Sequence, residues 1–130
     1  MTEDLATTLL IKPGTSVLLL NAPIGFQRKL APLPDGVTVS DKRGTSADVV
    51  VAFARDTGEL KRLATAFPAL EEDGILWVCY PNGGTGAGTD LDRDVLRAAM
   101  TKHDLAEQTL VAFDEQWSAM RFRATDDVGS

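Results

Sequence analysis

Apolar residues along this chain gather in three short runs that are hydrophobic at successive positions rather than at every second one. The runs are Ser16 to Leu20, Ala47 to Ala54 and Gly74 to Tyr80. Short, continuous apolar runs rich in valine and leucine are typical of parallel strands that are covered on both faces. The turn Pro-Asp-Gly introduces a weaker strand, Gly36 to Asp41.

Two segments between these runs show the period of an amphipathic helix. The apolar positions of the first, which follows Asp56 and Thr57, are Leu60, Leu63, Ala64 and Phe67. The apolar positions of the second are Leu91, Val95, Ala98 and Ala99. Thr89 or Asp90 is the expected N-cap of the second helix, which ends near Lys102 and His103.

The last part of the chain changes to alternation, from Leu110 onward, and predicts an antiparallel hairpin that turns near Asp114 and Glu115. Alternation places Met120 and Phe122 on the core face and Arg121 and Arg123 on the other. Trp117 shares the face of Arg121, where it either packs on the sheet beneath a helix, the favoured interpretation, or contacts a partner.

The order of these elements predicts an α/β fold with three layers. Right-handed crossovers favour a doubly wound, mostly parallel sheet of about six strands that the C-terminal antiparallel hairpin closes. Residues 1–130 are expected to form a single domain, with an ordered core over about 9–124 and loose termini.

Charge and composition limit the partners and the chemistry. A net charge of −6 makes nucleic acid and an anionic membrane unfavourable partners. Cys79, the single cysteine, is expected to be a small core residue in a reducing cytoplasm. His103 is the single histidine, so no histidine-based metal site is expected.

Several segments resemble an uncharacterised bacterial family of small proteins, a domain of unknown function with a reduced class I methyltransferase-like, Rossmann-like fold. They are IKPGTSVLLLNAPIGF, PLPDGVTV, ADVVVAFA, EDGILWVCYPN, GTDLDRDVLRAA and WSAMRFR, and the resemblance extends from Leu10 to Arg123. It implies the fold of a truncated class I methyltransferase and no particular reaction.

The resemblance directs attention to the loop after the first strand. In active methyltransferases of this fold, that strand carries an acidic residue and a G-x-G-x-G loop approaches the methyl donor. Here Leu19 stands at the acidic position, Asn21 and Pro23 replace two glycines, and Gly25 alone remains. Proline has no N–H and cannot adopt positive φ, so the loop lacks the properties that the donor needs.

A second family position is Asp41, which related enzymes use to accept hydrogen bonds from ribose hydroxyls. An ordinary polar turn is the favoured interpretation here. Asn21, Gly25 and Asp41 are therefore the hypothetical cofactor-binding residues.

A glycine-rich loop follows the third apolar run and offers another hypothetical ligand site, formed by Tyr80, Pro81, Gly84 and Gly86. Successive N–H groups could receive an anion there, although the spacing matches no phosphate-binding motif. A surface loop is favoured.

Three functions are consistent with these features. The first is a non-catalytic methyltransferase-like module that binds a protein partner, a second copy of itself or a small molecule. The alternative is a divergent S-adenosylmethionine-dependent methyltransferase, and a weaker one is a nucleotide- or anion-binding regulator. No catalytic residue or metal ligand is assigned, and no cofactor is expected, S-adenosylmethionine being disfavoured.

Overall fold

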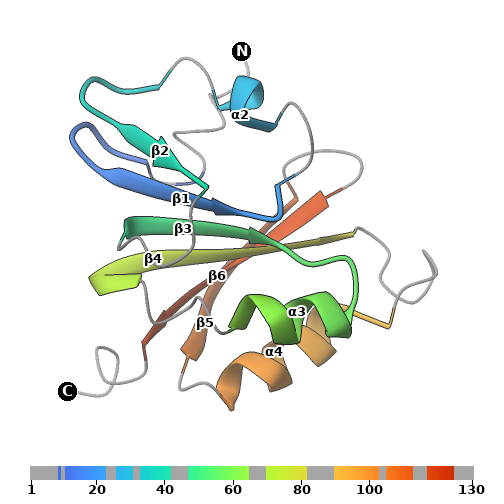
Figure 1. Cartoon of the computed structure of the whole chain (residues 1–130). Helices are drawn as coiled ribbons and strands as arrows, with labels where there is room; N and C mark the ends of the chain where they lie inside the picture. Colours follow the sequence, from blue (N-terminus) through green and yellow to red (C-terminus); the bar gives the residue numbers. More distant parts are fainter. Residues whose placement is uncertain are drawn as a thin grey trace.

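In the computed structural model, six strands among the described residues form one mixed sheet (Figure 1). The structure describes residues 9, 11–22, 26–30, 33–41, 47–64, 70–81, 90–102, 105–112 and 117–124. The strands are β1 (Ser16–Leu20), β2 (Thr38–Ser40), β3 (Ala47–Phe53), β4 (Leu70–Pro81), β5 (Leu105–Ala112) and β6 (Trp117–Ala124). The helices are α2 (Phe26–Lys29), α3 (Thr57–Ala64) and α4 (Arg93–Thr101).

The spatial order of the strands is β2-β1-β3-β4-β6-β5. Strands β2, β1, β3 and β4 are parallel to one another, whereas β6 runs antiparallel to both β4 and β5. The chain moves outward from β1 to β2 and then returns to place β3 on the other side of β1. The carboxyl ends of β1 and β3 therefore flank a topological switch point, the place where open α/β sheets bind ligands.

Helices cover both faces of this sheet, with α2 on one side and α3 and α4 on the other (Figure 1). Leu60 of α3 and Leu96 and Met100 of α4 belong to one buried cluster. Phe26 of α2 and the adjacent Leu30 belong to the second cluster. The three-layer, doubly wound α/β arrangement expected from the sequence is confirmed.

The C-terminal hairpin contributes to both cores because its side chains alternate. Met120 and Phe122 lie in the core under α3 and α4. Trp117 and Ala119 lie in the core on the side of α2. The Trp117 side chain is only 6% exposed, and its ring meets that of Phe53 edge-on at a centroid distance of 5.0 Å. Trp117 thus packs on the sheet, as the favoured interpretation predicted.

The start of α4 differs from the sequence prediction. Asp92, not Thr89 or Asp90, is the N-cap: its backbone is extended and its Oδ1 accepts a hydrogen bond from the Val95 N–H at 2.9 Å. Asp90 instead accepts hydrogen bonds from Thr57. The cap position was wrong because a second, equally suitable carboxylate lies two residues further along the chain.

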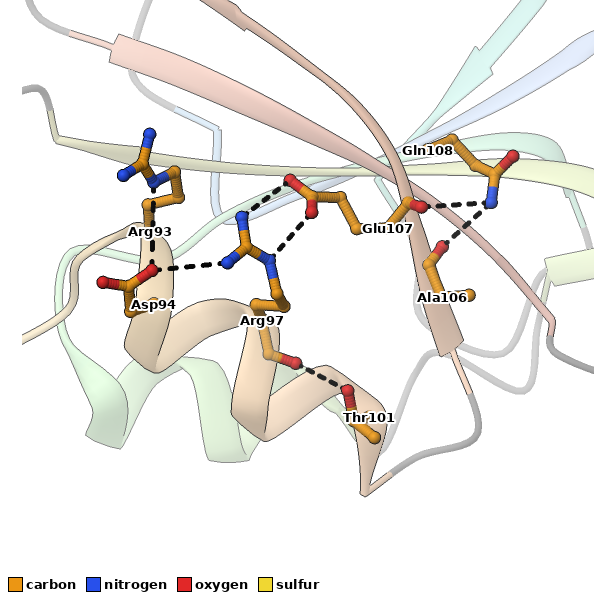
Figure 2. Close-up of polar contacts among 7 residues, drawn as sticks. All are labelled: Arg93, Asp94, Arg97, Thr101, Ala106, Glu107 and Gln108. Atoms are coloured by element: carbon orange, nitrogen blue, oxygen red, sulfur yellow. Dashed lines mark hydrogen bonds and ion pairs between the residues drawn. The ribbon is translucent and has the colours of Figure 1, made fainter.

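The predicted apolar face of α4 was wrong in part for the same reason. Leu91 is buried but precedes the helix, while Val95 is 38% exposed and Ala98 is also exposed. The buried positions are Leu96 and Met100, four residues apart, with Ala99 partly buried beside them. The exposed side of α4 is tied to β5, because the Arg97 guanidinium binds the Glu107 carboxylate at 2.8 Å (Figure 2).

The strand boundaries also differ in places. β4 begins at Leu70 and is longer than the apolar run, and its register with β3 shifts between Ala47 and Val49. β2 is limited to Thr38–Ser40, and β5 starts at Leu105. Cys79 is fully buried in β4, as expected. None of the helices in the described ranges is long and apolar enough to cross a membrane.

Candidate functional site

The carboxyl ends of β1 and β3 meet at Asn21, the residue that follows β1. Asn21 has a left-handed backbone with φ of 58°, and it is the only non-glycine residue with positive φ in the part of the chain that the structure describes. Its Nδ2 donates hydrogen bonds to the carbonyl oxygen of Phe53 at 2.8 Å and to Oε1 of Glu59 at 3.1 Å. The amide of Asn21 thus links the end of β1 to the end of β3 and to the first turn of α3.

Glu59 organises the beginning of α3. Its Oε1 also accepts the backbone N–H of Arg55 at 2.8 Å, and its own N–H donates to Oδ1 of Asp56 at 2.8 Å. Sequence analysis did not single out Glu59 as part of this site. Asp56 and Glu59 have the spacing of a capping box. This spacing is the sequence feature that could have predicted that the two carboxylates bind nearby backbone N–H groups.

Asp90 joins the start of α3 to the segment that leads into α4. Its two carboxylate oxygens accept hydrogen bonds from the backbone N–H of Thr57 at 2.9 Å and from the Thr57 hydroxyl at 2.6 Å. These hydrogen bonds lower the pKa of Asp90 below its ordinary value. The first turn of α3 is therefore held to the segment that precedes α4, at the carboxyl edge of the sheet.

Tyr80 and Pro81 end β4 at the same edge. Tyr80 is 6% exposed and packs in the core under α3 and α4, and Pro81 is partly exposed opposite Trp117. Burial raises the pKa of the Tyr80 hydroxyl, whereas Arg93 and a hydrogen bond with Ser118 oppose that rise. Tyr80 therefore remains a neutral phenol at neutral pH and cannot serve as a base there.

The family positions on β1 and β2 lie near this edge. Leu19 is 5% exposed and packs in the core on the side of α2, so an apolar side chain occupies the position of the acidic residue. Asp41 is exposed directly after β2. Because the last paired residues of β1 and β2 are Leu18 and Ser40, Asp41 ends roughly 7 Å short of Asn21 along the strand direction.

Three of the hypothetical site residues, Gly25, Gly84 and Gly86, lie outside the described residues, as does Pro23. The structure brings Asn21 together with the end of β3 and the start of α3. It places Asp41 and Tyr80 at the same sheet edge as Asn21, on separate strands.

Comparison with known proteins identifies the class of fold. Mitomycin 7-O-methyltransferase MmcR aligns with a TM-score of 0.64 and 10% identity, over 85% of this chain and 49% of that protein. Ribosomal protein L11 methylase from Lactobacillus delbrueckii subsp. bulgaricus aligns with a TM-score of 0.62 and 11% identity, over 95% and 80%. LepI, solved as a complex with SAM, aligns with a TM-score of 0.54 and 18% identity, over 92% and 39%.

These likenesses establish a class I methyltransferase-like α/β fold, in reduced form, as the sequence resemblance implied. The chain spans about half of MmcR and 39% of LepI. No protein-family profile and no curated protein matches the chain.

Proposed function

We propose that this chain is a non-catalytic methyltransferase-like module, which binds a partner or a small molecule rather than transferring a methyl group. The observation that carries the proposal is the engagement of Asn21. Its amide protons serve the Phe53 carbonyl and the Glu59 carboxylate, both within the chain. A methyl donor that approached the end of β1 would have to replace these hydrogen bonds.

Two further features support the proposal. Leu19, at the position where active relatives of the fold carry an acidic residue, is an apolar side chain packed in the core. Two carboxylates at the edge also bind groups of this chain: Asp90 accepts from the N–H and hydroxyl of Thr57, and Glu59 accepts from the backbone N–H of Arg55. These contacts position strand ends and helix starts, which is a structural role.

The test measures the binding of S-adenosylmethionine and S-adenosylhomocysteine by thermal unfolding and by calorimetric titration. A ligand present at one hundred times its dissociation constant stabilises the folded state by about 2.7 kcal/mol, which raises Tm measurably. We expect no saturable rise in Tm with either compound. Asp35→Ala is the matched control for Asp41→Ala, since both variants remove an exposed carboxylate next to β2. A saturable rise in Tm that Asp41→Ala abolishes and Asp35→Ala preserves would refute the proposal.

That outcome would instead support the alternative, a divergent S-adenosylmethionine-dependent methyltransferase. The fold favours this alternative, because the solved structures that share it include methyltransferases and a complex with SAM. In that case the Asp41 carboxylate would accept hydrogen bonds from the ribose hydroxyls of the methyl donor at the end of β2.

The protein partners that we propose for this module include a second copy of this chain. Trp117 is not available for such a contact, because it is buried against Phe53. Among the described residues, the large apolar side chains that are exposed are Val95 of α4, at 38%, and Leu110 of the edge strand β5, at 39%. Light scattering on the wild type and on Leu110→Ser tests whether self-association uses this edge. A wild type that remains monomeric would exclude a second copy as the partner.

A further inference from the structure

A small pocket lies at the amino edge of the sheet, on the opposite edge from the switch point. Its volume is about 210 Å³, and its lining residues are Gly74, Ile75, Gln108, Arg121, Phe122 and Arg123. Ile75 and Pro81 are six residues apart on β4, so the pocket lies about 20 Å from the carboxyl edge. Binding at this pocket is therefore independent of whether the switch point binds a methyl donor.

Two arginines from one strand converge on the pocket. Arg121 and Arg123 are two residues apart on β6, so both side chains are on the face that carries Trp117 and Ala119. Arg121 pairs with Trp77 of β4 on one side and with Thr109 of β5 on the other. Like charges this close on one face repel each other, and an anion between them would relieve that repulsion.

Arg121 carries a second signal. Its Nε is buried and has no hydrogen-bond partner among the residues that the structure describes. Buried polar groups in folded proteins are nearly always hydrogen-bonded, so a donor without a partner calls for an explanation. The described residues that line the pocket include no acidic side chain that could satisfy it. A ligand that brings its own acceptor oxygens would offset the paired charges and supply the acceptors that the described lining lacks.

The hairpin also has an irregularity at the pocket. The pairing of β5 with β6 shifts between Glu107 and Thr109, which leaves Gln108 as the extra residue of a bulge. The Gln108 amide folds back and donates to the carbonyl oxygen of Glu107 at 3.2 Å (Figure 2). Bulges redirect side chains and recur beside binding sites. This bulge brings Gln108 to the rim of the pocket beside the arginines.

We propose that this pocket binds a small molecule with a carboxylate or phosphate group, held by the guanidinium groups of Arg121 and Arg123. Guanidinium forks match the planar pair of oxygens of a carboxylate and the oxygens of a phosphate. The volume is below the roughly 300 Å³ at which pockets for drug-sized ligands begin, so the pocket suits a small ligand better than a whole nucleotide. The ligand class is a small oxyanion, recognised by a chain whose overall charge is negative.

The first test uses the wild-type protein and the NMR signal of the Arg121 Nε–H group. The probes are inorganic phosphate and succinate, with neutral succinamide and matched sodium chloride as controls. We expect the Arg121 signal to shift saturably with phosphate or succinate and to stay unchanged with succinamide and with chloride. A signal that none of the probes moves, or that chloride moves equally, would overturn the proposal. Phosphate and succinate titrations also show which of the two oxyanions binds better.

Variants then assign the binding to the two arginines. Arg121→Gln and Arg123→Gln should each weaken the probe about tenfold or more, because each removes one charge-assisted pair of hydrogen bonds. Arg28→Gln is the matched control, since it removes one exposed positive charge from α2. Circular dichroism verifies that each variant is folded. Equal losses in all three variants would show a general charge effect and refute the site, as would binding that survives in both pocket variants.

Discussion

Replacing Asn21 tests whether this residue has a structural role in the fold. Asn21 has two properties that the fold uses: a left-handed backbone with φ of 58° and an amide that donates to Phe53 and Glu59. Asn21→Gly removes the amide but accepts the backbone geometry, because glycine adopts positive φ without steric cost. Asn21→Ala removes the amide and is also disfavoured at that φ. The pair of variants therefore separates the two contributions.

The magnitudes follow from the contacts. The partly buried hydrogen bond to the Phe53 carbonyl contributes about 1 kcal/mol to the free energy of unfolding. The exposed contact with Glu59 adds little. The left-handed backbone costs alanine about 1 kcal/mol more than glycine. We therefore expect Asn21→Gly to lower the stability by about 1 kcal/mol and Asn21→Ala by about 2 kcal/mol.

Urea unfolding measures both differences, provided that the m value is unchanged between variants. For a chain of this length each 1 kcal/mol corresponds to a decrease in Tm of about 3–4 °C. If Asn21→Gly is as stable as the wild type, the amide does not hold the strand ends together and the structural role is wrong. If the two variants are equally stable, the backbone contribution is wrong.

Three other predictions concern the same elements. Trp117→Ala should lower the free energy of unfolding by about 3–5 kcal/mol, because it leaves a cavity against Phe53; urea unfolding would contradict this if the loss is below 1 kcal/mol. Asp92→Ala should cost about 1 kcal/mol in the same assay by removing the N-cap of α4, and an unchanged midpoint would exclude that role. Because the pKa of Asp90 is lowered in the folded state, its contribution to stability is present above the ordinary value of 3.8 and is lost as pH falls through the folded-state pKa. Tm measured from about pH 5 to pH 2 should therefore decrease less in Asp90→Asn than in the wild type, and parallel pH profiles would refute this.

The local pattern of the sequence determined the strands and the general architecture. The mostly apolar runs at Ser16 to Leu20 and Ala47 to Ala54 predicted β1 and β3 almost to the residue, because a strand covered on both faces is apolar at successive positions. Alternation likewise predicted that Met120 and Phe122 lie on one face of β6 and Trp117 on the other, as the two cores show.

Helix starts were less well determined by the sequence. Asp90 and Asp92 are both chemically suitable N-caps, and only the position of Thr57 in the folded chain assigns one to α3 and the other to α4. The buried face of α4 depends on that choice. Because α4 begins at Arg93, Leu91 lies outside the helix, and Leu96 and Met100 are the helix residues that pack in the core.

The candidate sites divide in the same way. The sequence named Asn21, because a local departure from a glycine-rich loop can be seen along the chain. It could not show that the amide of Asn21 binds Phe53 and Glu59, which are more than thirty residues away in the chain. Nor could it show that β6 lies between β4 and β5, which is what brings Arg121 and Arg123 beside Ile75. Strand formation depends on neighbouring residues, whereas hydrogen-bond partners and pockets depend on which distant segments the fold brings into contact.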